Sequence, residues 1–241
     1  MKKLTSSLRG RKYIAFLDFE GTQFSHEMIA IGAQFVSLDK HGKIKKRKEP
    51  FKLLVRSQNK VGSFVTNLTG ITDSIVAKEG VTFETAMRKL KQYIGINFTK
   101  CMFVTYGNHD MRILNQSIAH NFSYPKDICS QIQHFYLDFA ALFAEFVRDA
   151  NGNTLSLIHA CELYGAPLYG KPHDPEADAV NLANLYDAFV EHTEITLEEY
   201  KKAVLKVNKF PDPISRVIRK LSNGESITPE EYELLLKDYL S

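Results

Sequence analysis

Short apolar runs and longer helical patterns alternate along the chain up to about residue 190. The runs at 13–17 and 28–36 are apolar at nearly every position, which is typical of central strands covered on both faces. Three further short runs, at 51–55, 102–106 and 135–137, lie between turn residues or helical patterns and also predict strands. We therefore expect five strands in this part of the chain.

Helical periodicity connects and follows these strands. Thr82 opens the first such pattern, which places Ala86, Leu90 and Ile94 on one face. The order of elements predicts a mixed α/β fold, in which an antiparallel hairpin joins an otherwise parallel sheet flanked by helices. The expected helices cover 82–94, the residues after Gly107 up to Ile118, 139–147, 154–164 and 175–191.

After Thr193 the pattern changes to short helices alone. We expect an α/β domain at 10–192 and a helical extension at 193–241. The extension is expected to pack on the domain as an appendage, and a role in substrate binding or self-association is the alternative. Two capping-box spacings predict helix starts there, Thr196 with Glu199 and Thr228 with Glu231.

The composition is that of an ordinary globular protein, with 241 residues, of which 44% are hydrophobic and 24% charged. The three cysteines form no Cys-x-x-Cys pair, which argues against a zinc cluster or a disulfide framework. The basic N-terminus is not followed by an apolar signal segment, and no apolar run approaches the ~20 residues that span a bilayer. We therefore expect a soluble cytoplasmic protein that does not bind membranes.

Positive charge is concentrated at one end of the chain. Residues 1–60 hold 14 Lys and Arg against 5 Asp and Glu, although the net charge of the whole chain is only +3. The densest run, 43–48, is expected at the tip of the hairpin. It suits a polyanionic partner, whose phosphates it could hold in a salt-sensitive way. A solvated hairpin tip explains the same residues equally well.

Two carboxylates end the first strand. Side chains alternate along a strand, so Asp18 and Glu20 point to one face, while Phe19 points to the other. They lie at the carboxyl end of a buried strand, where open α/β sheets place ligands. An acidic strand end that faces water is the alternative explanation for this pair taken alone.

Acids also stand at two expected helix starts. Asp110 follows the fourth strand in the first turn of a helix, where the helix dipole favours a negative charge. Asp174 and Pro175 form a helix start, which leaves His173 in the loop and Asp178 one turn into the helix. The break between loop and helix lets His173 and Asp178 converge on one site. Each feature taken alone also has a purely structural explanation.

The three clusters together change the interpretation, because one α/β sheet can bring all of these positions to one cleft. Four carboxylates with one histidine form a hard-oxygen site. Such a site suits Mg²⁺ or Mn²⁺ better than zinc.

The motifs Asp18-x-Glu20-Gly21-Thr22, Asn108-His109-Asp110 and His173-x-x-x-x-Asp178 resemble the three exonuclease motifs of the DEDDh superfamily. These enzymes are 3′→5′ exonucleases of ribonuclease-H-like fold. The segments 16–22, 68–71 and 105–110 are most similar to the Eri-type exoribonuclease branch. The chain differs from that branch at Tyr106 and His109, where tryptophan is common. The resemblance covers about residues 12–190.

The resemblance implies a function and a site. It implies a mixed five-stranded sheet, two divalent ions (Mg²⁺ or Mn²⁺) held by the four acids, and His173 as the base that takes a proton from the attacking water. The expected substrate is single-stranded RNA, shortened from its 3′ end to nucleoside 5′-monophosphates. A DNA-directed exonuclease and a non-catalytic nucleic-acid-binding protein are the alternatives. The positions expected to border the terminal nucleotide are Gly21, Thr22, Leu68, Gly70, Ile71 and Asn108.

Overall fold

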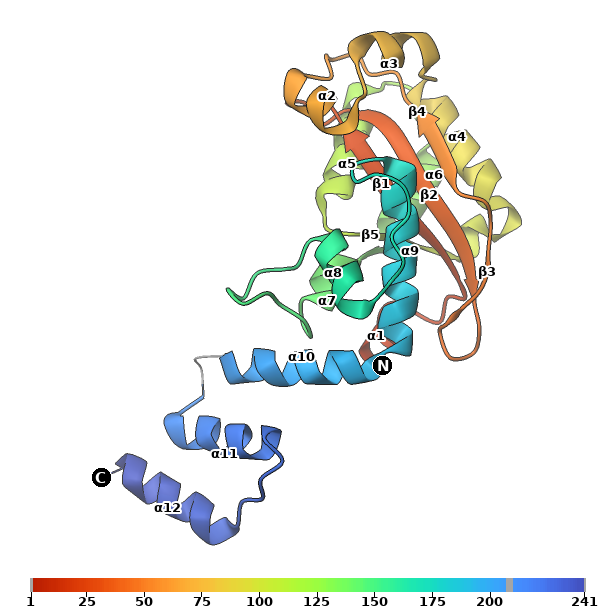
Figure 1. The fold of residues 1–241 in the computed structure, drawn as a ribbon. Helices are drawn as coiled ribbons and strands as arrows, with labels where there is room; N and C mark the ends of the chain where they lie inside the picture. The colour runs from red at the N-terminus through yellow and green to blue at the C-terminus, as the bar shows by residue number, and fades with distance from the viewer. Residues whose placement is uncertain (1, 207–209, 241) are drawn as a thin grey trace.

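The computed structural model describes residues 2–206 and 210–240. A central sheet is flanked on both faces by helices, and three C-terminal helices extend away from it (Figure 1). The strands are β1 (Tyr13–Gly21), β2 (Met28–Leu38), β3 (Ile44–Arg47), β4 (Phe51–Leu54), β5 (Cys101–Thr105) and β6 (Tyr136–Asp138). The helices are α1 (Lys2–Ser7), α2 (Ser63–Thr69), α3 (Asp73–Glu79), α4 (Phe83–Ile94), the 3₁₀ helix η1 (Gly95–Lys100), α5 (His109–His120), α6 (Lys126–His134), α7 (Phe139–Phe143), α8 (Leu157–Tyr164), α9 (Pro175–Glu191), α10 (Thr193–Lys206), α11 (Asp212–Ser222) and α12 (Pro229–Leu240).

The strand order is β3-β2-β1-β5-β6, and β4 also pairs with β2. β2 runs antiparallel to β1, whereas β5 runs parallel to β1 and β6 runs parallel to β5. This arrangement confirms the mixed α/β fold with an antiparallel hairpin.

The sheet has six strands rather than the expected five, because the basic hairpin tip is itself a strand. β2 is 11 residues long, and β4 pairs only with its residues 30–33. The backbone of Val36, Ser37 and Leu38 is therefore left for β3, which supplies Arg47, Lys46 and Ile44 as their partners. Unpaired backbone groups next to a core favour such pairing over an open loop.

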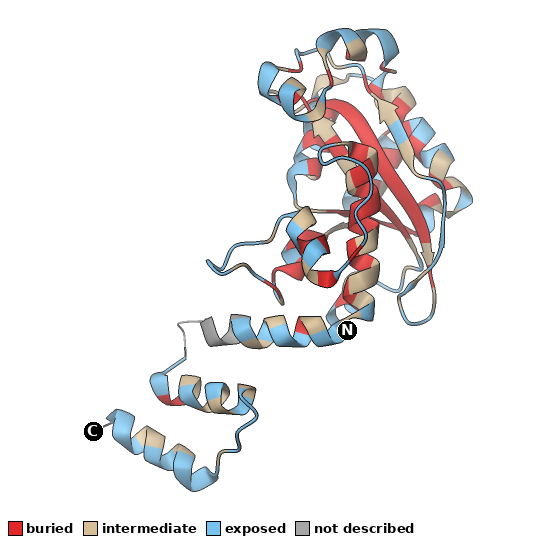
Figure 2. Ribbon diagram, viewed as in Figure 1, coloured by how far each residue is buried: buried red, intermediate tan, exposed pale blue. Residues whose placement is uncertain are grey.

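The two faces of β1 pack in two separate cores. Ile14 and Phe16 lie in a core that α7, α8 and α9 complete, while Ala15 and Leu17 lie in one that α4, α5 and α6 complete. Figure 2 shows the resulting buried band through the sheet and α9. Leu4 of α1 is buried in the first of these cores, so the N-terminal helix packs on the same body.

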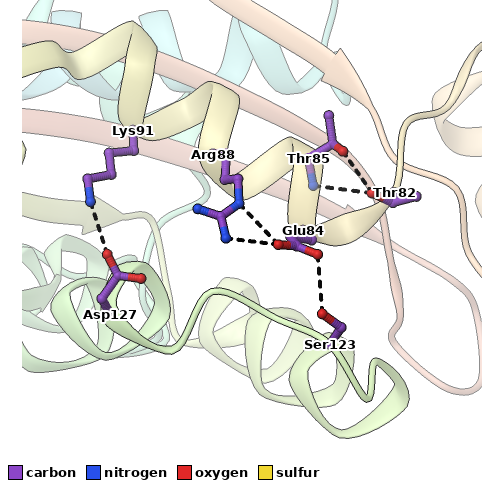
Figure 3. Close-up of polar contacts among 7 residues, drawn as sticks. All are labelled: Thr82, Glu84, Thr85, Arg88, Lys91, Ser123 and Asp127. Carbon is purple, nitrogen blue, oxygen red and sulfur yellow. Dashed lines mark hydrogen bonds and ion pairs between the residues drawn. The ribbon is translucent and has the colours of Figure 1, made fainter.

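Polar contacts fix α4 against the segment that carries α6 (Figure 3). Thr82 caps the helix by accepting a hydrogen bond from the Thr85 backbone N–H at 3.2 Å, as its position predicts. Glu84 accepts from the Ser123 hydroxyl at 3.2 Å, and Lys91 pairs with Asp127 at 3.0 Å. The buried face of α4 includes the three expected residues, so this helix is confirmed in start, end and orientation.

Four helices that the pattern does not predict are α1, α2, α3 and α6. The first three have six or seven residues, which is too short for a helical period to be read. α2 buries only Val65, and α3 buries only Val76. The positions of α2 and α3 depend on packing with β2 and with the loop at Val61 rather than on local pattern.

The C-terminal region confirms one of the two expected capping boxes. At α12, the backbone N–H of Thr228 donates to Glu231 at 2.9 Å, and that of Glu231 donates to the Thr228 hydroxyl at 3.2 Å. The box at Thr196 is wrong, because α10 already begins at Thr193. The Thr196 hydroxyl is buried and lies 2.7 Å from the hydroxyl of Tyr164 instead. A tertiary contact has replaced the local cap.

No helix within the described residues is both long and apolar enough to cross a membrane.

Candidate active site

A cleft of about 380 Å³ lies at the carboxyl end of β1. It brings together residues that are far apart in the sequence, from β1, α2, α5 and the start of α9. All four predicted acids and the predicted histidine line it. The lining residues are Asp18, Phe19, Glu20, Gly21, Thr22, Gln23, His26, Phe64, Val65, Leu68, Tyr106, His109, Asp110, His173 and Asp178.

Strand β1 and helix α5 position three of the acids. Asp18 and Glu20 alternate with the buried Phe19, so both point to the face that α9 covers. Asp110 lies in the first turn of α5 and is buried. Its Oδ1 accepts a hydrogen bond from the backbone N–H of Phe19 at 2.7 Å. This bond fixes the second motif directly against the first.

The start of α9 delivers the third motif. Asp174 caps the helix by accepting from the Glu176 backbone N–H at 3.0 Å, and Pro175 is the first helical residue, as predicted. His173 lies in the preceding loop with a left-handed φ of 61°. Its backbone N–H donates to Oδ2 of Asp178 at 3.0 Å, so loop and helix do converge on one site.

A glycine permits α9 to approach the sheet this closely. Gly32 lies opposite Asp18 in β1 and opposite Lys52 in β4. A Cβ atom at Gly32 would lie 1.7 Å from the carbonyl oxygen of Pro175, which no side chain can tolerate. On the far side of this glycine, Lys52 forms an ion pair with Asp174 at 2.6 Å. The close approach to Gly32 and the Lys52–Asp174 ion pair therefore together fix the start of α9.

Burial and mutual repulsion shift the acids in the same direction. Burial is the main cause that raises the pKa of Glu20 to about 8, and the Asp178 and Asp110 charges add to it. Burial likewise raises the pKa of Asp110 to about 7 against the opposing effect of its backbone hydrogen bonds. The pKa of Asp18 is raised well above its ordinary value by burial and then by Asp110 and Glu20. Burial also raises the pKa of Asp178.

The chemistry of this donor set fits hard divalent cations. The clustered donors are carboxylate oxygens, and cations between them would relieve the repulsion that adds to burial in raising their pKa values. Among the described residues, no three His, Cys, Asp or Glu side chains are arranged around a single ion position. Asp110 and Asp178 each accept a hydrogen bond from a backbone N–H, of Phe19 and His173 respectively, which orients both carboxylates in the cleft.

The six positions expected to border the substrate divide into two groups. Gly21, Thr22 and Leu68 line the cleft, whereas Gly70, Ile71 and Asn108 are not among its lining residues. Gly70 ends α2 in the left-handed conformation with φ 75°, a backbone geometry that favours glycine.

Packing or hydrogen bonding also explains the residue types at Ile71, Gly21 and Thr22. Ile71 is buried in a small core with Ile29 and Val61. A Cβ at Gly21 would lie 2.9 Å from the Ile113 side chain, so helix packing by itself requires a small residue there. The Thr22 hydroxyl accepts from the Glu27 backbone N–H at 3.0 Å.

The pattern gives no signal for several residues of the cleft. His109, to which the sequence assigns no role, lines it and lies edge-on to His26, with ring centroids 5.3 Å apart. His26 has a left-handed φ of 53°, which is uncommon outside glycine. Phe64 of α2 lines the cleft and is 64% exposed. The sequence alone does not show that this exposed aromatic residue lies beside the carboxylates, and only the fold reveals it.

The structure thus combines a mixed α/β sheet with an acidic cleft at the carboxyl end of β1. Residues 15–186 match the family RNase_T, described as "Exonuclease". The chain therefore belongs to this exonuclease family. A comparison with curated proteins gives no match.

Several solved structures share the fold. A full-length 3′-exonuclease is 21% identical over 76% of this chain and 83% of its own, with a TM-score of 0.60. The nuclease domain of 3′hExo, a DEDDh family member bound to rAMP, is 22% identical over 75% and 92%, with a TM-score of 0.58. Exonuclease I of E. coli, in complex with a dT13 oligonucleotide, is 17% identical over 86% of this chain and 45% of its own, with a TM-score of 0.56. These likenesses support the ribonuclease-H-like fold.

Proposed function

We propose that this protein is a metal-dependent 3′→5′ exonuclease that shortens single-stranded RNA and releases nucleoside 5′-monophosphates. The observation that carries the proposal is the convergence of Asp18, Glu20, Asp110, Asp178 and His173 on one cleft. These residues come from three separate motifs in a chain of the exonuclease family.

The four acids are proposed as the ligands of two divalent ions, Mg²⁺ or Mn²⁺. Ions bound there would supply activation of the attacking water and stabilisation of the leaving 3′-oxygen. The protein's own contribution is to hold carboxylates of raised pKa close together, so that cation binding releases protons from them. Asp110 and Asp178 are held in place by the hydrogen bonds that they accept.

His173 is proposed as the general base. It lines the cleft, is exposed and lies next to Asp178, whose carboxylate accepts its backbone N–H. Histidine is the side chain that most often accepts a proton as a general base in enzymes. The left-handed backbone at His173 turns the chain sharply into α9. The Lys52–Asp174 ion pair holds the next residue, so Lys52 supports His173 indirectly.

The terminal nucleotide is proposed to lie between β1 and α2. Leu68 is 42% exposed on α2 and would press against a base, and Gly21 and Thr22 would border the sugar and phosphate. Gly70, Ile71 and Asn108 are proposed to act through the elements that they end or anchor. Gly70 and Ile71 hold α2 in place, and Asn108 precedes α5.

RNA is favoured because segments 16–22, 68–71 and 105–110 resemble the Eri-type exoribonuclease branch. The 3′hExo domain with bound rAMP supports the same choice. Exonuclease I binds a DNA oligonucleotide, so a DNA-directed exonuclease is the second candidate. A non-catalytic nucleic-acid-binding protein is the third, and the full set of acids argues against it.

The deciding experiment is a time course on 5′-labelled RNA and DNA of matched sequence, with Mn²⁺ or Mg²⁺ and with EDTA. Stepwise shortening of RNA from its 3′ end that stops in EDTA is the expected result. Faster shortening of DNA would establish the second candidate. A wild-type protein inert on both polymers with either metal would overturn the proposal.

The domain boundaries and the extension complete the proposal. We propose that residues 10–192 form the exonuclease domain and that 193–241 form a helical extension, which is a candidate for self-association. Leu234, Tyr239 and Leu240 of α12 are largely exposed, which suits such contacts. Light scattering on full-length and truncated protein tests this point. A cytoplasmic location is likewise part of the proposal.

A further inference from the structure

A second groove lies at the opposite end of β1. It has a volume of about 480 Å³, and no acidic residue is among those that line it, all of which are described. Four of its ten lining residues are lysines and one is an arginine. The lining residues are Lys12, Tyr13, Phe35, Ser37, Leu38, Lys45, Lys46, Arg47, Lys48 and Asn97.

The floor of this groove is an open piece of sheet face. Tyr13 lies opposite Ser37 in the β1–β2 register, and Ser37 lies opposite Lys46 in β3. α4 covers this face of the sheet nearer the centre and ends at Ile94, and η1 then contributes Asn97 to the groove. The end of the sheet face is therefore left accessible.

Two aromatic rings form part of that floor. The rings of Tyr13 and Phe35 are parallel, with centroids 6.0 Å apart and an interplanar angle of 8°. Phe35 is buried, whereas Tyr13 is half-buried. Lys48 reaches across Phe35, with its Nζ 5.4 Å from the ring centroid. Tyr13 therefore offers the accessible ring, and an aromatic ring beside cations suits unpaired bases and their phosphates.

The lysines of the groove differ in how they are engaged. Arg47 pairs with Asp187 at 3.5 Å, and Lys48 donates to the backbone carbonyl of Tyr93 at 2.6 Å. Lys12, Lys45 and Lys46 have no ion-pair partner within the described part of the chain, and all three are exposed. Three exposed ammonium groups are thus available to phosphates.

We propose that this aromatic-basic groove is a second binding site for single-stranded RNA, separate from the catalytic cleft. The inference rests on the proposed function for the identity of the polymer. The groove lies seven residues from Glu20 along β1, about 23 Å at the usual strand rise, and on the other face of the sheet. A short substrate therefore fills the cleft alone, and only a longer strand reaches both sites.

Equilibrium binding tests the groove without relying on catalysis. The probe is a 5′-labelled single-stranded RNA of 20 nucleotides, measured by fluorescence anisotropy with the full-length protein in EDTA. Lys45→Glu/Lys46→Glu is expected to weaken binding at least tenfold. It is also expected to reduce the slope of log affinity against log salt by about 1.4, since two phosphate contacts are lost. Lys89→Glu/Lys126→Glu makes the same charge change on exposed lysines of α4 and α6 and is expected to leave binding nearly unchanged.

Aromatic stacking has its own pair of variants. Tyr13→Leu removes the ring and is expected to weaken binding at least about fivefold, whereas Tyr13→Phe keeps the ring and the affinity. Circular dichroism establishes that each variant is folded. Unchanged binding in both the lysine and the Tyr13→Leu variants would overturn the proposal, as would an equal loss in the Lys89/Lys126 control.

Turnover of a trinucleotide with Mn²⁺ separates this proposal from the proposed function. The groove variants are expected to degrade the trinucleotide at the wild-type rate. A wild type that binds the long RNA through the groove but degrades neither RNA would refute the exonuclease proposal alone. A wild type that degrades RNA while the groove variants bind normally would refute the groove alone.

Discussion

The two ends of strand β1 carry opposite chemistry on opposite faces of the sheet. Asp18 and Glu20 point from the carboxyl end into a cleft of half-buried or buried, mutually repelling acids. Tyr13, at the amino end, lies in a groove of lysines on the other face. One nine-residue strand therefore separates a site suited to cations from a site suited to phosphates. The net charge of +3 therefore conceals two surfaces of opposite charge.

The largest expected effect comes from removing an acid of the cleft. Asp18→Asn should lower exonuclease activity at least about a thousandfold, equivalent to about 4 kcal/mol of transition-state stabilisation. Because a neutral amide removes a repelling charge, the variant should remain folded and should not melt below the wild type in EDTA. Single-turnover assays and thermal unfolding measure the two quantities. Retained activity would contradict the assignment of Asp18, and RNA binding at the groove is the internal control.

His173→Ala should lower the rate by about a hundredfold or more, in the usual range for loss of a general base. Its metal affinity should change far less, because the four acids are intact. Titration of Mn²⁺ followed by calorimetry, alongside kcat, separates the two effects. Equal losses of rate and of metal affinity would instead place His173 among the metal ligands.

The next largest expected effect is a pH dependence of stability that the acids at the carboxyl end of β1 cause and the lysines at its amino end do not. Burial raises the pKa of Glu20 to about 8 and that of Asp110 to about 7 in the folded protein, whereas both carboxyls regain their ordinary pKa on unfolding. Between the ordinary carboxyl pKa of about 4 and these raised values, the folded state binds more protons than the unfolded state. The free energy of unfolding therefore falls as pH rises through that range. In EDTA, Tm should be several degrees lower at pH 8.5 than at pH 5.5.

Two additions test the cause of this fall. Mn²⁺ should raise Tm more at pH 8.5 than at pH 5.5, because ions replace the protons. Glu20→Gln should flatten the dependence, while Lys45→Glu, at the other end of β1, should not. A Tm that rises with pH in EDTA would show that the acids are not as buried as described.

The smallest expected effect concerns Lys52 of β4, which lies two strands away from Asp18, at the same end of the sheet. Its positive charge lowers the pKa of Glu20, and it holds Asp174. Lys52→Met should lower kcat by about two- to fivefold, since the ion pair is partly exposed. The acidic limb of the pH–rate profile should move to higher pH. Lys60→Met, an exposed lysine nearby in the sequence, is the control, and identical profiles for both variants would remove this role from Lys52.

Much of the site could be predicted because each acid stands at an element start or end that the pattern marks. Asp18 follows a fully apolar run, and Asp174-Pro175 marks the start of α9. Gly32, Lys52 and His26 could not be found in this way. Their importance depends on neighbours across the sheet or across the cleft, and local pattern carries no information on those neighbours.

Tertiary contacts also explain where the observed elements differ from the predicted ones. β3 was expected as a loop because Lys45, Lys46 and Arg47 look like a solvated tip, yet β2 offers them an unpaired backbone. Thr196 has the spacing of a helix cap, but the buried hydroxyl of Tyr164 is its partner. Local propensity was correct wherever tertiary contacts did not compete with it, as at Thr82 and Thr228.

The missing side chain at Gly32 has a consequence for how such enzymes could lose their activity. One added methyl group there would lift the first turn of α9 away from the strands and carry Asp178 out of reach of Asp18. Every residue of the three motifs would still be present. A paralogue with alanine at this position would thus keep the full signature of a nuclease and yet be inert, and inspection of its motifs alone would classify it wrongly.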